Sequence, residues 1–307
     1  MSLNNSEKFL ICNAGYNTAS VLPDGTINTC FDRKESLGNI YTGFEFKKEL
    51  ARCDFKFCDC PLWSFEKNLH AIAKGRLPAN QPAYDAFLHW HVTYNCNMFC
   101  HYCTLFPGNK ERDLEEKKRP AKPINISAMM NVLEASGKTF LISFTGGEPF
   151  LVPHLAEVCA ELTKKHFVCF NTNLTMLDMK LFEIANVDHI GMLNISMQIQ
   201  PMEKLHLTDR FVEKIHAMQR IGFSRYRITV VADPALFPKV KHYRDKFGEH
   251  GIRFKLIPLI DGGGVFQGKA YPESYTPEEL EMIERDWLNE YFPLNNTKVN
   301  FLAAAAL

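Results

Sequence analysis

The sequence lacks three features that would place the protein in a special class. It carries no excess charge, because 35 Lys and Arg residues balance 35 Asp and Glu residues, so the composition gives no signal for a nucleic-acid or membrane-surface partner. No apolar run approaches the roughly 20 residues of a membrane span. Residues 1–9 do not show the charged-then-apolar layout of a signal peptide. We therefore expect a soluble, cytoplasmic protein with no membrane partner.

Cysteine, by contrast, is abundant. The chain of 307 residues contains ten cysteines, and in a reducing compartment clustered thiols are metal ligands more often than disulfides. Cys159 and Cys169 each stand alone in an apolar stretch, so we expect them to be small core residues. The remaining cysteines form two groups, which are Cys12, Cys30, Cys53, Cys58 and Cys60 in the first and Cys96, Cys100 and Cys103 in the second.

From residue 86 onward, short apolar runs alternate with amphipathic segments. The expected strands cover residues 86–94, 139–144, 167–173, 189–199, 225–232 and 252–260. The expected helices cover residues 127–136, 152–166, 176–187, 208–222, 238–251 and 276–288. Six strand–helix units in this order predict an α/β fold with a parallel sheet, a partial (β/α)6 barrel of the TIM type, whose chemistry lies at the carboxyl ends of the strands. The polar residues 108–123 are expected to form a surface loop.

The second cysteine group directly follows the first strand of this barrel. Cys96, Cys100 and Cys103 have the spacing C-x3-C-x2-C. A mononuclear zinc site usually has four protein ligands and pairs of C-x2-C arms. A cubane iron–sulfur cluster has four irons, so three thiolates leave one iron open to another ligand. The spacing therefore favours a catalytic iron–sulfur cluster, and the alternatives are a zinc knuckle or three buried thiols.

At this point a resemblance to a family is visible. The stretch "CNMFCHYC" (96–103) resembles the C-x3-C-x-aromatic-C signature of the radical S-adenosylmethionine (radical SAM) enzymes. A second stretch, "FTGGEP" (144–149), closes the second strand, as the Gly-Gly-Glu-Pro motif of that family does. Either motif alone has a false-positive risk, but both occur in the right order on adjacent strand ends. The resemblance covers about residues 86–260.

The resemblance implies a set of cofactors and a reaction. Cys96, Cys100 and Cys103 would hold a [4Fe–4S] cluster, and the amino and carboxylate groups of S-adenosylmethionine would bind its open iron. One electron, supplied by a reductant such as flavodoxin or ferredoxin, would cleave the sulfonium to methionine and a 5′-deoxyadenosyl radical. That radical abstracts a hydrogen atom from a substrate C–H bond. The cofactors carry this chemistry, and the protein positions and shields it.

The resemblance also implies which residues contact S-adenosylmethionine. The aromatic side chain between the last two cysteines would stack on adenine, although packing is its ordinary role. The paired glycines let the backbone approach a ligand closely, and the glutamate would bind the methionine ammonium. Polar residues at the third and fourth strand ends would contact ribose and carboxylate. The expected contacts are Tyr102, Gly146, Gly147, Glu148, Pro149, Asn173 and Ser196.

The sequence leaves the roles of three further polar residues open. His89 and His91 alternate on the first strand and therefore face the same side, either lining a cavity or lying in the core with their hydrogen bonds satisfied. Arg210, near a helix start, either pairs with the methionine carboxylate or is an ordinary surface arginine.

The first cysteine group indicates a second metal site. "PDG" at 23–25 predicts a tight turn between strands at 18–22 and 26–30, with Cys30 at the end of this hairpin. Several thiolates in a small, loop-rich unit suit a closed zinc site or a fully ligated iron–sulfur cluster. We expect the ligands to be Cys12, Cys30, Cys58 and Cys60, with Cys53 able to replace either of the last two.

This cysteine-rich hairpin resembles the auxiliary-cluster module of some radical SAM enzymes, called SPASM or, in its shortened form, twitch. It departs from that module in preceding the barrel and in ending with C-x-C in place of C-x2-C. We expect one auxiliary iron–sulfur cluster, with a structural zinc site as the alternative. The predicted organisation is the module at 1–67, a bridge at 68–85, the barrel at 86–303 and a vector-like tail at 304–307.

These features predict a radical SAM enzyme whose auxiliary cluster assists oxidation or binds substrate. The family resemblance implies a small-molecule substrate (a sugar, an aminocyclitol or a nucleotide) or a ribosomal peptide. The alternatives from other classes are a non-enzymatic iron–sulfur electron carrier or scaffold and a zinc-binding interaction protein. An electron carrier or scaffold would explain the cysteines but not the Gly-Gly-Glu-Pro stretch or the barrel.

Overall fold

A computed structural model describes residues 10–30, 35–53, 84–103, 105–106, 111–259, 269 and 271–288. Its centre is a parallel sheet of strands that pair in chain order. They are β7 (Ala86–Thr93), β8 (Phe140–Gly146), β9 (Phe167–Thr172), β10 (Ile190–Ser196), β11 (Tyr226–Val231) and β12 (Lys255–Ile257). This order is the predicted one for a partial barrel, and β12 stands at one edge of the sheet, so the barrel is not closed.

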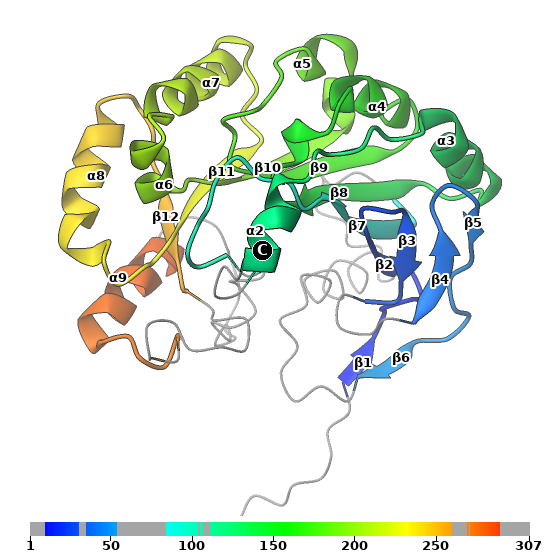
Figure 1. Cartoon of the computed structure of the whole chain (residues 1–307), viewed down its shortest axis with the longest axis horizontal. Coiled ribbons are helices and arrows are strands. Elements are labelled where there is room, and N and C mark those ends of the chain that lie inside the picture. The colour runs from blue at the N-terminus through cyan, green and yellow to red at the C-terminus, as the bar shows by residue number, and fades with distance from the viewer. Residues whose placement is uncertain are drawn as a thin grey trace, which may run out of the picture.

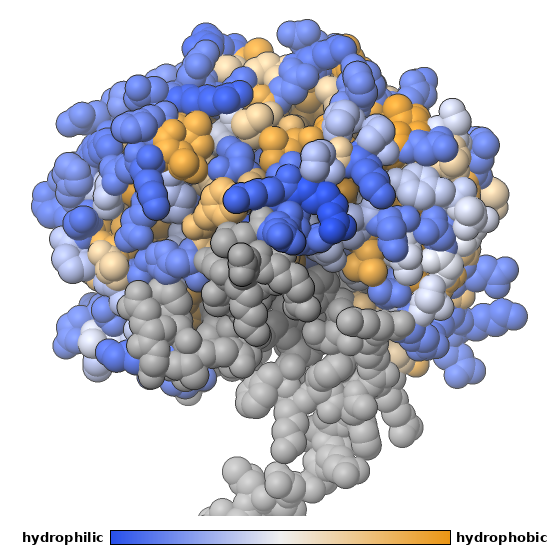
Figure 2. All heavy atoms as spheres, in the orientation of Figure 1, coloured by the Kyte–Doolittle hydropathy of each residue, from blue (hydrophilic) through white to orange (hydrophobic). Residues whose placement is uncertain are grey.

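Helices connect these strands, and those between residues 126 and 248 form a row along one side of the sheet, whereas the helix at 111–118 lies apart from that row (Figure 1). The helices are α2 (Glu111–Lys118), α3 (Ile126–Ala135), α4 (Leu155–Leu162), α5 (Leu181–Ile184), α6 (Ile199–Lys204), α7 (Thr208–Arg220), α8 (Val240–Gly248) and α9 (Pro277–Leu288). Short 3-10 turns are η1 (Pro149–Leu151), η2 (Val187–His189) and η3 (Phe237–Lys239). Hydrophilic residues dominate the rim of the face shown in Figure 2, and no helix among the described residues is long and apolar enough to cross a membrane.

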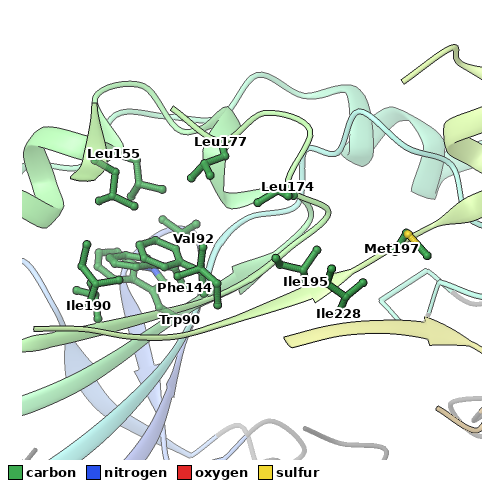
Figure 3. Close-up of a cluster of buried hydrophobic side chains, with 14 of the residues drawn as sticks. Trp90, Val92, Phe144, Leu155, Leu174, Leu177, Ile190, Ile195, Met197 and Ile228 are labelled. Atoms are coloured by element: carbon green, nitrogen blue, oxygen red, sulfur yellow. The ribbon is translucent and has the colours of Figure 1, made fainter. Parts of the chain in front are cut away.

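The core lies between the sheet and this row of helices (Figure 3). Trp90, Phe144 and Phe170 from three adjacent strands are fully buried. The ring centroid of Phe144 lies 5.6 Å from that of Trp90 and 5.5 Å from that of Phe170. Leu155 of α4 and Leu177 pack above them in the same cluster. Burial of each such side chain stabilises the fold by about 1.5–3 kcal/mol. Aromatic and branched residues at alternate strand positions therefore favour formation of this apolar layer. Cys159 is fully buried here, as expected.

The alternate residues of the same strands point to the opposite side of the sheet, which we call the inner face. Its members are mostly polar, in contrast to the aliphatic and aromatic residues between them. Successive members are aligned across strands by the register of the sheet. Its polar and thiol-bearing members are His89, His91, Ser143, Thr145, Cys169, Asn171, Asn194, Ser196, Arg227 and Thr229.

The N-terminal strands extend the same sheet. They are β2 (Thr18–Val21), β3 (Thr26–Asn28), β4 (Ser36–Asn39) and β5 (Gly43–Phe44), and β2 pairs in parallel with β7. The antiparallel pairing of β2 with β3 matches the expected hairpin, and Gly25 at its turn has a φ of +85°, a conformation that favours glycine. A separate pair joins β1 (Leu10–Cys12) to β6 (Ala51–Cys53). The sheet therefore runs across the predicted domain boundary, whose position stays a prediction.

The prediction of a loop over residues 108–123 is wrong, because α2 forms within it. The stretch is polar, yet its Glu, Arg, Leu and Lys residues are strong helix formers, and the side chain of Lys117 is buried.

The predicted helix at 176–187 is reduced to the single turn of α5. The carboxylate of Asp178 accepts a hydrogen bond from the backbone N–H of Lys180, and Asn186 caps η2 in the same way. Such local bonds compete with helix formation. The predicted segments at 152–166, 189–199 and 252–260 are also longer than α4, β10 and β12.

Candidate functional site

The loop that carries Cys96, Cys100 and Cys103 lies at the carboxyl end of β7, next to the end of β8. The backbone N–H of Gly147 donates to the Thr93 carbonyl at 2.7 Å, and that of Glu148 donates to the Asn95 carbonyl at 2.8 Å. A Cβ on Gly147 would lie 2.0 Å from the Asn95 oxygen. The paired glycines thus allow the two segments to approach as closely as they do.

Glu148 is fully buried and joins the ends of β8 and β9. Its carboxylate accepts hydrogen bonds from the Thr172 hydroxyl at 2.7 Å, the Asn173 backbone N–H at 2.8 Å and the Phe150 backbone N–H at 3.2 Å. Burial raises the pKa of Glu148 to about 7, against the opposing effect of these donors. The carboxylate thus links the ends of β8 and β9 by hydrogen bonds. Its expected contact with the methionine ammonium stays a prediction.

Asn173 connects the end of β9 to the cysteine loop. Its side-chain amide donates to the Asn97 side-chain oxygen at 2.8 Å, and its own oxygen accepts from the Thr175 backbone N–H and hydroxyl. Asn97 in turn donates to the Thr175 hydroxyl at 2.9 Å. Because Asn97 lies between the first two cysteines, these amides hold the middle of the loop against the sheet.

The last part of the loop contacts β10 and the residues after β11. The Tyr102 hydroxyl hydrogen-bonds the Gln198 side chain, which donates to the Ser196 hydroxyl. Burial raises the pKa of Tyr102 well above its usual range. His101 Nε2 lies 2.9 Å from Asp233 Oδ2. The cysteine loop is thus attached to the ends of four successive strands after β7.

The three thiols are brought together in a partly buried position. Burial, followed by smaller effects that include the charges of neighbouring thiols, raises the pKa of Cys96 to about 11 and that of Cys100 to about 12. The backbone N–H of Met98 donates to Cys96 Sγ at 3.4 Å. Thiolates in this environment need a compensating cation. Among the described residues, no three His, Cys, Asp or Glu side chains gather around one point as ligands of a single ion would.

The donor set fits an iron–sulfur cluster. Thiolates are the ligands of such clusters, and each iron of a cubane takes its own cysteine. The three cysteines lie within eight residues of one loop, which is fastened to the sheet on both sides of Cys100. Cys96, Cys100 and Cys103 are therefore the residues that could hold a [4Fe–4S] cluster.

The inner face runs from this loop toward the amino ends of the strands. Register aligns Asn171, Asn194 and Arg227 across β9, β10 and β11, and Asn194 donates to Asn171 Oδ1 at 2.8 Å. Cys169, expected in the core, lies on this face beside Ser143 and within electrostatic range of Arg227. Within the described residues, Asn194 Oδ1 is buried with no hydrogen-bond partner, so this face has polar groups left for a ligand.

The histidines of β7 belong to the same face. His89 and His91 are buried with ring centroids 5.1 Å apart. Burial lowers the pKa of His89 to about 3 and that of His91 to about 4, so both rings are neutral at pH 7. Within the described residues, His89 Nδ1 has no hydrogen-bond partner, which favours the cavity-lining alternative for His89. Arg210, on the first turn of α7, is exposed like a surface arginine.

The first cysteine group is only partly described. Cys30 is buried and packs with Ala14, Phe87 and Leu141 at the amino ends of β7 and β8. Backbone pairing of β1 with β6 sets Cys12 opposite Ala51. Cys58 and Cys60 lie outside the described residues. Cys30 and the three-cysteine loop therefore stand at opposite ends of β7, about 20 Å apart along the strand from the strand rise.

The structure brings together at one edge of the sheet all the residues expected to contact S-adenosylmethionine. The residues that the sequence analysis missed are Asn97, His101, Lys117, Thr175 and Asp233. Asp233 follows directly after β11, so its position at a strand end is a signal that could have found it. Lys117 offered no such signal, because its burial depends on contacts between distant segments.

Comparison with known proteins agrees with this geometry. The model of the Radical SAM superfamily matches residues 90–240, which include both motifs. This segment is therefore similar to the radical SAM superfamily. Members of the superfamily are enzymes, and the similarity implies a [4Fe–4S] cluster and S-adenosylmethionine. The matched segment begins within β7 and ends at the first residue of α8.

Two curated relatives are named GTP 3′,8-cyclase. The one from Chlorobaculum tepidum is 29% identical over 136 residues, which are 42% of this chain and 39% of that protein. The one from Mycobacterium marinum is 23% identical over 174 residues, which are 51% of this chain and 47% of that protein. The matches thus span less than half the length of either relative.

The chain also resembles solved structures. anSMEcpe with bound AdoMet has 17% identity and a TM-score of 0.43, with 64% of this chain and 55% of that chain covered. SuiB of Streptococcus suis, solved with its precursor peptide SuiA, has 18% identity and a TM-score of 0.40, with 73% of this chain and 49% of that chain covered.

Proposed function

We propose that the protein is a radical SAM enzyme that abstracts a hydrogen atom from an unactivated C–H bond of its substrate. The observation that carries the proposal is the loop of Cys96, Cys100 and Cys103, fastened by hydrogen bonds to the ends of several parallel strands beside the Gly-Gly-Glu-Pro turn. When bound, the cluster supplies the electron that splits S-adenosylmethionine into methionine and a 5′-deoxyadenosyl radical.

The residues of this chain position the cofactors. Gly146 and Gly147 let backbone groups of β8 face the methionine moiety, and Glu148 with Pro149 holds the turn in place. Asn173 and Ser196 offer polar groups to ribose and carboxylate from the next strand ends. Tyr102, fixed by its hydroxyl to Gln198, presents an aromatic ring for adenine. A one-electron reductant such as flavodoxin or ferredoxin completes the system.

The inner face supports a compact polar substrate. Its neutral histidines, side-chain amides and Arg227 lie between the cysteine loop and the amino ends of the strands, where hydrogen-bonding groups suit a sugar, an aminocyclitol or a nucleotide. The name of the two curated relatives, GTP 3′,8-cyclase, states a nucleotide substrate for those proteins. We therefore place a small molecule ahead of a ribosomal peptide as the substrate class.

An auxiliary iron–sulfur cluster is the second part of the proposal. Its ligands would be Cys12, Cys30, Cys58 and Cys60, with Cys53 as a replacement for one of the last two. The packing of Cys30 against Phe87 and Leu141 supports this proposal, because it puts a buried thiol at the amino ends of β7 and β8. From there the cluster could take an electron from a substrate radical or bind the substrate.

Anaerobic reconstitution with iron and sulfide tests the main proposal. The loaded protein should be brown and should release 5′-deoxyadenosine when reduced in the presence of S-adenosylmethionine. Cys100→Ala should abolish this release. Cys159→Ala, the control in which a buried core thiol is lost, should retain it. Release that persists in Cys100→Ala would refute the assignment. Iron binding without any release would favour an electron carrier, and zinc without iron would favour a zinc-binding interaction protein.

Iron counting tests the auxiliary cluster separately. Cys30→Ala should lower the iron content by about one cluster and should retain release of 5′-deoxyadenosine in the absence of substrate, because the three-cysteine loop is unchanged. An unchanged iron content in this variant would exclude Cys30 as a ligand and would restore the zinc alternative for this group.

A further inference from the structure

A buried lysine lies against the cysteine loop. Lys117, near the end of α2, is 1% exposed and is among the largest fully buried side chains of the described residues. Its carbonyl oxygen accepts the backbone N–H of Cys96 at 3.1 Å, so α2 and the first cysteine are directly joined. Fully buried lysines are rare, because the ammonium loses its hydration. A position of this kind therefore calls for a compensating interaction.

Two aromatic rings from the cysteine segment provide part of that compensation. The Lys117 ammonium lies 5.2 Å from the centroid of Phe106 and 5.8 Å from that of Phe99, within the range of cation–π attraction. Phe99 directly precedes Cys100, and the backbone N–H of Phe106 donates to the Cys103 carbonyl at 3.2 Å. The rings hold the charged end of the lysine beside the segment that carries the thiols.

The charge of this lysine reaches the thiols. Its ammonium acts electrostatically on both Cys96 and Cys100, in keeping with the backbone bond between Lys117 and Cys96 and the contact with Phe99. Glu148 acts on Cys96 in the opposite direction. Within the part of the chain that the structure describes, the surroundings of the loop thus combine the three thiols and Glu148 with the buried ammonium of Lys117.

We propose that the buried ammonium of Lys117 stabilises the reduced form of the cluster held by Cys96, Cys100 and Cys103. This inference rests on the proposed function. A cluster with three thiolates becomes more negative by one charge on reduction, and a fixed cation in a region of low dielectric favours the more negative state. The electron comes from the one-electron reductant named above. Lys117 therefore raises the reduction potential toward the range of that reductant.

The test is an anaerobic redox titration of the reconstituted full chain, followed by electron paramagnetic resonance without S-adenosylmethionine. The variants are Lys117→Met, Lys117→Gln and Lys117→Arg, with Lys118→Met as the matched control, because Lys118 is the exposed neighbour on the same helix. Cys30→Ala serves as the background in every case, so that the signal reports the three-cysteine loop. Iron content is measured in each variant.

Loss of the ammonium should lower the equilibrium constant for reduction about tenfold, which is 59 mV for a one-electron couple. Lys117→Arg should stay close to the parent, and Lys118→Met should not differ from it. A parent potential retained by iron-loaded Lys117→Met or Lys117→Gln would overturn the inference; the Gln variant keeps a polar end if the Met variant fails to fold. A parent protein that binds no iron would instead overturn the proposed function.

Discussion

The two faces of the central sheet are built from alternate residues of the same strands, yet they differ in kind. On the helix-facing side, Trp90, Phe144 and Phe170 are fully buried in one apolar cluster. On the inner face, the residues one position away are polar, and Asn194 has a buried oxygen with no hydrogen-bond partner within the described residues. Because a period of two separates the faces, one set of strands can serve both stability and ligand binding.

Polar residues at alternate strand positions are compatible with a partial barrel, because its interior need not be filled with apolar side chains. A closed barrel with a packed interior is filled by branched apolar side chains, whereas here Ser143, Cys169 and Asn171 occupy the equivalent side. Such groups are unfavourable in a dry core unless they are paired. We interpret the inner face as a surface with hydrogen-bonding capacity left for a ligand, because Asn194 Oδ1 has no partner within the described residues.

The largest expected difference between the faces is in stability. Phe144→Ala should lower the free energy of unfolding by about 3–5 kcal/mol, because it opens a cavity between Trp90 and Phe170. Ser143→Ala, one position away on the inner face, should change it by about 1 kcal/mol or less. Urea unfolding of the two variants measures both values. Equal losses would show that the inner face is part of the packed core.

The second difference concerns pH. His89 is neutral in the folded protein because burial lowers its pKa from 6.5 to about 3, so the unfolded chain binds more protons between these values. Stability should therefore fall as the pH drops from 6.5 toward 3, by up to about 1.4 kcal/mol per pH unit for this group. His89→Gln should flatten that slope in urea unfolding at pH 7, 6 and 5. A slope that is identical in the variant would contradict burial of the neutral ring.

The smallest expected effect is that of a hydrogen bond within the inner face. Asn194→Ala removes the bond to Asn171 Oδ1 and should lower the free energy of unfolding by about 0.5–1.5 kcal/mol. Ile195→Ala, the neighbour on the helix-facing side, is fully buried and should lower it by about 2–5 kcal/mol. If the asparagine variant proves the less stable of the two in urea, the division between the faces fails for β10.

Much of the fold was predictable because the signals are local. Each strand of the barrel combines branched or aromatic residues at alternate positions, and the six strands appear in the expected order. The expected site was also predictable, since Cys96 and Glu148 follow strands, and strand ends meet at one edge of a parallel sheet. The placement of the cysteine loop there needs no more than the motif and the strand order.

Other features could not be predicted because they depend on contacts between distant segments. Pairing of β2 with β7 makes the N-terminal hairpin part of the barrel sheet, although the two strands are far apart in the chain. Lys117 lies in a stretch whose polarity suggests a loop, and its burial arises only where α2 meets the cysteine segment. The bonds of Glu148 to Thr172 and Asn173 likewise require two strand ends to meet.

The sequence by itself determined the alternation of strands and helices and the spacing of Cys96, Cys100 and Cys103, because side-chain period and loop length are properties of neighbouring residues. Only the tertiary structure decided which groups surround those thiols: the amides and hydroxyl that fasten the loop, the carboxylate of Glu148 and the ammonium of Lys117. Electrostatic and hydrogen-bonding partners are chosen by distance in space, and that distance exists only once the sheet has formed.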